Sequence, residues 1–104
     1  MSAACSKMKY EARLKKLSRF IARSEFDGVL ISKRYDVEYL TGFFSPGVML
    51  FVSAQDVPVY FIDPMNENLA RRELHGTGVY VSAGGVLKDI SGYFRKRQIR
   101  KIGI

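Results

Sequence analysis

A chain of 104 residues, of which 47% are hydrophobic and 26% charged, has the length of one domain and the composition of a globular protein. These values exclude a disordered or collagen-like chain. No apolar run approaches the roughly 18 residues that a membrane-spanning helix needs, and no apolar signal segment precedes Cys5. We therefore expect a cytoplasmic protein without membrane contact.

The formal net charge of +7 is concentrated near the two ends of the chain. The cationic residues of these two regions are Lys7, Lys9, Arg13, Lys15, Lys16, Arg19 and Arg23, and then Lys88, Arg95, Lys96, Arg97, Arg100 and Lys101. Such charge is typical of proteins that bind nucleic acid or an acidic partner, and an autonomous basic interaction module is one interpretation of the chain. No RNP-like aromatic pattern, zinc-finger spacing or KH-type loop accompanies the charge, so solvated helix faces are the favoured interpretation and no specific nucleic-acid binding is expected.

The first predicted element is an amphipathic helix over residues 8–24. Its apolar residues recur at helical spacing, and Phe20 widens the stripe. The stripe consists of Tyr10, Leu14, Leu17 and Ile21. We place a tail at residues 1–9 and the domain at residues 10–104.

Residues 28–31 and 47–52 read as two short buried strands, and the segment between them is dense in polar and aromatic groups. Asp36 can cap a single helical turn over residues 37–40, which Gly42 can end in the left-handed conformation. The turn would present its side chains at a sheet edge. These are Tyr35, Asp36, Glu38 and Tyr39.

A β-hairpin is expected next, because residues 48–52 and 59–62 are apolar runs joined by a short polar loop. Asp63 followed by Pro64 is a helix-start signal, which predicts a helix over residues 64–74. Its buried face would consist of Leu69, Ala70 and Leu74.

A strand over residues 78–81, a helix after residues 83–85 and a strand over residues 100–104 complete the order. The apolar stripe of this last helix is Val86, Leu87, Ile90, Tyr93 and Phe94. Strands that alternate with helices predict an α/β domain of three layers, with a mixed, mostly parallel sheet around a central antiparallel hairpin and helices on its faces.

One motif carries a family resemblance. The run Tyr39-Leu40-Thr41-Gly42-Phe43, between a strand and a glycine-led apolar strand, resembles the signature of the N-terminal domain of the creatinase, prolidase and Xaa-Pro aminopeptidase family. Residues 26–28, 61–63 and 101–104 extend the resemblance from about Tyr10 to Ile104. After Asp63 members of the family often continue Gly-Arg-Tyr, whereas this chain has Pro64-Met65-Asn66, so no role of that arginine is carried over.

The resemblance implies a non-catalytic N-terminal domain of a metal-dependent Xaa-Pro aminopeptidase or prolidase. In such peptidases a following C-terminal domain holds two divalent metal ions, here expected to be Mn, Co or Zn, and hydrolyses proline-containing peptides. This chain alone is predicted to be inactive and to have no cofactor. Its expected partners are its own catalytic domain and a second copy, bound as a homodimer through the N-terminal domain.

The resemblance also assigns the turn a place near the active-site mouth, where it faces substrate or a neighbouring subunit. The residues that carry this hypothesis are Tyr35, Asp36, Glu38, Tyr39 and Phe43. The alternative is that Tyr39, Leu40 and Phe43 pack the turn onto the sheet.

Overall fold

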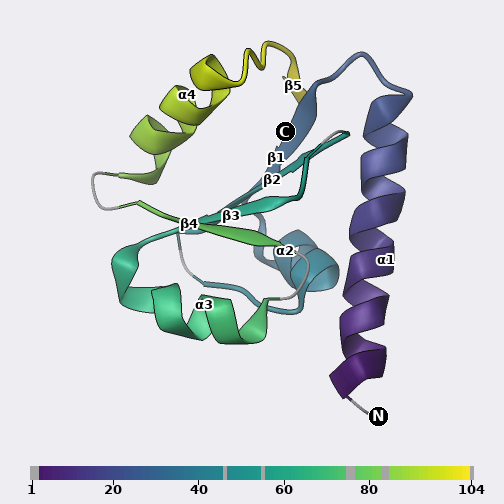
Figure 1. The fold of residues 1–104 in the computed structure, drawn as a ribbon, viewed down its shortest axis with the longest axis vertical. Coiled ribbons are helices and arrows are strands. Elements are labelled where there is room, and N and C mark those ends of the chain that lie inside the picture. Colours follow the sequence, from purple (N-terminus) through teal and green to yellow (C-terminus); the bar gives the residue numbers. More distant parts are fainter. Residues whose placement is uncertain (1–2, 46, 55, 75–76, 83–84, 104) are drawn as a thin grey trace.

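The computed structural model describes residues 3–45, 47–54, 56–74, 77–82 and 85–103, and side chains from Lys9 on. Four predicted features lie partly outside the described residues: the 1–9 tail at positions 1–2, the 53–58 loop at position 55, the 83–85 lead-in at positions 83–84, and the end of the last strand at Ile104. Within the described residues the chain forms three layers, with a sheet between helices (Figure 1). Helices α1 (Ala3–Ala22), α2 (Arg34–Thr41) and α3 (Glu67–Glu73) pack on one face. Helix α4 (Val86–Lys96) packs on the other.

The sheet has the strand order β4-β3-β2-β1-β5. Its strands are β1 (Gly28–Ile31), β2 (Met49–Ser53), β3 (Val59–Ile62), β4 (Gly78–Val81) and β5 (Ile102–Gly103). The predicted hairpin is confirmed, because β2 pairs antiparallel with β3. The prediction of a mostly parallel sheet is wrong: among the described strands β1–β2 is antiparallel too, and only β3–β4 and β1–β5 are parallel. The reason is that α2 joins two neighbouring strands that run in opposite directions, so the strand–helix–strand order of residues 28–53 is not a crossover between parallel strands.

The central strands β2 and β3 supply the core on both faces. Side chains alternate along a strand, so Leu50 and Tyr60 face α1–α3 while Phe51 and Phe61 face α4. The Phe51 ring lies 4.9 Å from the Phe94 ring, and the Phe61 ring lies 5.4 Å from that of Tyr93, centroid to centroid. Each buried Phe contributes about 1.5–3 kcal/mol through burial.

Helix α1 begins at Ala3, within the segment predicted as a tail. Its apolar stripe is confirmed at Leu14 and Ile21, which are buried, but Phe20 was wrongly included, since 71% of its surface is exposed. Successive residues differ by about 100° around a helix, so a residue beside Ile21 turns away from the sheet. Within the described residues no helix is both long enough and apolar enough to cross a membrane.

Asp63 caps the next helical segment as predicted: its Oδ1 accepts a hydrogen bond of 3.2 Å from the Asn66 N–H. A 3₁₀ turn over Pro64–Asn66 precedes α3, whose buried residues are Ala70 and the following Leu74. Leu69 is exposed, contrary to prediction.

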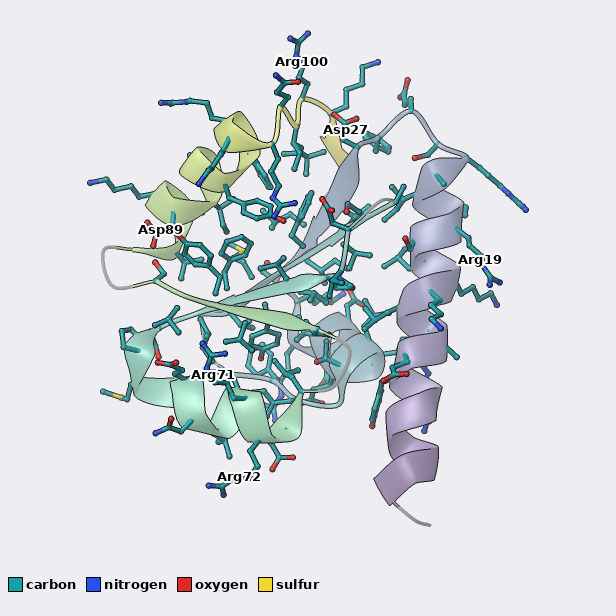
Figure 2. All side chains as sticks on the ribbon, viewed as in Figure 1. Arg19, Asp27, Arg71, Arg72, Asp89 and Arg100 are labelled. Carbon is teal, nitrogen blue, oxygen red and sulfur yellow. The ribbon has the colours of Figure 1, made fainter. Side chains whose placement is uncertain are left out.

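Helix α4 runs through Gly92 without a break and buries Ile90. Its residue Leu87 is exposed rather than packed, because it lies off the flank that faces Phe51 and Phe61. After α4 the chain returns to β1, where the Asp27 carboxylate accepts hydrogen bonds from the Arg100 and Lys101 N–H groups at 2.8 and 3.0 Å. Figure 2 shows Asp27 and Arg100 at this end of the molecule. These two bonds lower the pKa of Asp27 and bring β5 alongside β1.

Tyr60 links the sheet to the segment that follows α2. Its side chain is fully buried, and its hydroxyl donates to the Phe43 carbonyl and accepts from the Ser45 N–H, both at 3.1 Å. Burial raises the pKa of Tyr60 to about 12, although the Ser45 N–H stabilises the phenolate and acts in the opposite direction.

We predict that Tyr60→Phe lowers the free energy of unfolding by about 1–3 kcal/mol, because the buried Ser45 N–H loses its acceptor and the Phe43 carbonyl loses one of its two donors. Tyr80→Phe on β4, where the ring is exposed, is the control and should change it by under about 0.5 kcal/mol.

The wild-type protein and the Tyr60→Phe variant also test the raised pKa of Tyr60. The phenol ionises near 10 when unfolded and near 12 when folded, so its contribution to stability is present below pH 10 and is lost between about pH 10 and 12. Denaturant titrations should show the difference between wild type and Tyr60→Phe shrinking over that range. A difference that stays constant from pH 9 to 12 would contradict the assignment.

Candidate contact surface on helix α2

The candidate site is built on α2, which begins earlier than the sequence suggested. Lys33 occupies the N-cap position in an extended conformation and makes no side-chain capping bond. The prediction that Asp36 caps the helix is therefore wrong. Asp36 lies inside the first turn, where its charge is favourable near the positive end of the helix dipole.

Gly42 ends α2 as predicted. It has φ of +78° in the left-handed region, and its N–H donates to the Glu38 carbonyl at 2.8 Å. A Cβ at this position would lie 2.6 Å from the Tyr10 ring of α1. Glycine is thus required here both by the backbone conformation and by the closeness of α1.

One flank of α2 belongs to the core. Val37, Leu40 and Thr41 are buried, and the Thr41 hydroxyl donates to the Val37 carbonyl at 2.7 Å. Phe43 follows the helix and is half-buried, with its ring 5.9 Å from that of Tyr60. Phe43 therefore contributes to packing, and its contact with substrate or a subunit stays a prediction.

The other flank presents the remaining predicted residues. Tyr35 is 76% exposed and Tyr39 is 58% exposed, and Asp36 is also exposed. Glu38 is half-buried and pairs with Arg34 one turn earlier, with 3.0 Å between Nε and Oε1. At a surface, a phenol ring can stack on an apolar group of a ligand, and a carboxylate can accept hydrogen bonds from it.

Arg13 of α1 is part of this surface, although its place in the sequence favoured a solvated helix face. Its Nη1 donates to the Tyr39 carbonyl at 2.7 Å, and its guanidinium carbon lies 3.9 Å from the centroid of the Tyr39 ring. The two residues are 26 positions apart, so no local pattern could have indicated the contact.

A groove of about 570 Å³ lies between α1, β1 and α2. Of the five predicted residues, Asp36 and Tyr39 line it, whereas Tyr35, Glu38 and Phe43 are not part of its lining. Leu17 and Phe20 of α1 and Val29 and Ile31 of β1 give it an apolar floor and wall. The structure thus divides the predicted set between this groove, the outer surface and the core.

No group of three His, Cys, Asp or Glu side chains in the described part of the chain could hold a metal ion. Among its described residues the candidate surface thus offers aromatic rings and charged side chains for binding, rather than a set of metal ligands.

A sequence profile of the creatinase/prolidase N-terminal domain matches residues 13–104. The chain belongs to this family. The resemblance first seen in residues 39–43 is thereby confirmed, and it extends over residues 13–104. Among curated proteins, no sequence matches the chain.

Solved structures give the same fold. The Xaa-Pro aminopeptidase (aminopeptidase P) from Streptococcus thermophilus superposes with a TM-score of 0.81 at 22% identity, over 89% of this chain and 71% of that one. The N-terminal domain of the cytoplasmic peptidase PepQ from Mycobacterium tuberculosis H37Rv gives 0.76 at 28% identity, over 88% and 70%. The Xaa-Pro dipeptidase from Bacillus anthracis gives 0.79 at 15% identity, over 89% of this chain and 26% of its own. This family domain therefore corresponds to about a quarter of that dipeptidase.

We predict that Gly42→Ala destabilises the domain more than Gly47→Ala. The two glycines have φ of +78° and +80°, so the backbone strain, about 1–2 kcal/mol, is matched. A Cβ at Gly47 would meet nothing within 4 Å, whereas at Gly42 it meets the Tyr10 ring.

The excess loss should disappear in a Tyr10→Ala background, which removes the ring. Chemical denaturation of the single and double variants measures both effects. Equal losses for the two glycine variants would show that α1 does not press against the end of α2.

Proposed function

We propose that this chain is the non-catalytic N-terminal domain of an Xaa-Pro aminopeptidase or prolidase. The observation that carries the proposal is the family match over residues 13–104. The similarity to an aminopeptidase P, an Xaa-Pro dipeptidase and the peptidase PepQ supports a hydrolase of this kind.

The Mn, Co or Zn ions of such a metallopeptidase would belong to a catalytic domain beyond this chain. The described residues do not fit a metal site, since no three potential ligands converge. We therefore assign no catalytic step to this chain. Cytoplasmic location is part of the same proposal and is supported by the description of PepQ as cytoplasmic.

The role proposed for the domain is to shape substrate access and assembly, the latter as a homodimer. The physical support is the division of α2 into two flanks. Val37 and Leu40 anchor the helix in the core, so Tyr35 and Tyr39 are exposed from a fixed position. A fixed aromatic surface binds a proline-containing peptide or a second subunit at low entropic cost, because neither the helix nor the rings need much ordering.

We predict that Tyr35→Phe and Glu38→Gln, introduced into the complete peptidase, each lower kcat/KM for an Xaa-Pro peptide severalfold. The reason is that Tyr35→Phe removes a hydroxyl and Glu38→Gln removes a negative charge, while both preserve the shape of the side chain. Both should change the free energy of unfolding of the isolated domain by under about 0.5 kcal/mol, since the Arg34–Glu38 pair is exposed.

Ser91→Ala on α4 is the control, because this exposed residue lies on the opposite face of the sheet. The isolated chain, assayed with the same peptide and added Mn, Co or Zn, should show no turnover. Full activity of both α2 variants would contradict the role in substrate access, and metal-dependent turnover by the isolated chain would contradict the non-catalytic assignment.

A second candidate function is binding to an acidic partner. It is favoured by the cations on α1, because none of those with a described side chain forms an ion pair with an Asp or Glu.

A further inference from the structure

Helix α1 carries a stripe of cations around one exposed aromatic side chain. Lys9, Arg13, Lys16 and Phe20 follow one another at spacings of three or four residues, which places them on one flank of α1, and Arg23 comes directly after the helix ends at Ala22. This flank lies beside the buried stripe rather than opposite it, because Arg13 contacts Tyr39 of α2 and Lys16 lines the groove.

The charges of this stripe have no carboxylate partner. All ten Asp and Glu side chains of the sequence are among those described, and none lies within ion-pair distance of a cation with a described side chain on α1. Arg13 is bound to a carbonyl and a ring, and Lys9 lies 5.9 Å from the Tyr10 ring centroid. Cations along a helix that have no carboxylate partner create a positive potential, which attracts an anionic ligand.

The groove beside the stripe supplies the apolar part of a binding site. Val29 and Ile31 are half-buried at its floor, and Phe20 and Tyr39 stand on opposite sides as large exposed rings. Its volume of about 570 Å³ lies within the range of pockets that hold small ligands or single large side chains. One carboxylate, Asp36, stands on the α2 wall.

We propose that this groove binds an acidic peptide segment of a partner protein that carries a large apolar side chain. The apolar side chain lies on Val29 and Ile31 between the two rings, and the acidic residues face Lys16 and Arg23. Asp36 repels them on the other wall, so the acidic side of the peptide is directed towards α1. Within this groove a second copy of the chain is a poorer occupant than an acidic peptide, because the cationic stripe favours a negatively charged segment and the chain as a whole carries a net charge of +7.

The test is fluorescence anisotropy of a labelled, glutamate-rich peptide with a central phenylalanine, titrated with the 104-residue chain at physiological salt. Lys16→Glu should weaken binding about tenfold or more, and Phe20→Ser should weaken it severalfold. Asp36→Asn should strengthen it, because it removes the repelling charge. The matched control is Lys88→Glu on α4, which changes the net charge equally on the other face and should leave the affinity within about twofold.

Peptide variants separate the contribution of charge from that of the apolar side chain. Glutamine in place of glutamate and alanine in place of phenylalanine should each weaken binding. Equal weakening by Lys16→Glu and Lys88→Glu would show non-specific charge attraction and overturn the proposal. So would the absence of binding by the wild-type chain, or tighter binding of a single-stranded oligonucleotide than of the peptide. This inference rests on the second candidate function, binding to an acidic partner. The measurement needs no peptidase activity, so its failure would leave the proposal of a non-catalytic peptidase domain untouched.

Discussion

The buried hydroxyl of Tyr60 is the interaction on which the arrangement of the candidate surface depends. It holds the Phe43 carbonyl and the Ser45 N–H, so the backbone after α2 is fixed to strand β3. Ser45 is itself buried. This anchor comes directly after Gly42, where α2 ends in the left-handed conformation and meets the Tyr10 ring of α1. The phenol thus fixes the segment that follows the contact between the two helices.

The groove follows from the same constraint. Arg13 reaches the carbonyl and ring of Tyr39 because the end of α2 lies against α1. Asp36 and Tyr39 belong both to the exposed flank of α2 and to the groove, so the two proposals share residues. A partner bound in the groove would cover part of the flank proposed to face substrate, and the two uses would then compete.

Local rules accounted for much of the fold. The Asp63 cap and the left-handed Gly42 were predictable because each depends on the backbone of a few neighbouring residues. The strands were predictable from apolar runs, and the hairpin from its short polar loop. Three apolar helix residues were wrongly predicted to be buried: Phe20, Leu69 and Leu87. Helical spacing identifies which residues share a flank, but it does not tell how much of that flank the sheet covers. Asp36 was misassigned as a cap because the helix begins earlier than its polar side chain suggests: Lys33 is the N-cap, and Arg34 and Tyr35 are already helical. The Arg13–Tyr39 contact and the groove depend on packing between distant segments, which no local pattern encodes.

The central claim is that α2 is a fixed part of the core rather than a movable cover. Native-state hydrogen exchange tests it most directly, because it measures the opening free energy of each amide. The account predicts that the Gly42 amide, bonded to the Glu38 carbonyl, and those of Leu40 and Thr41 open with nearly the same free energy as the amides of β2. Opening free energies for α2 that are several kcal/mol lower than those of β2, and independent of denaturant, would contradict it.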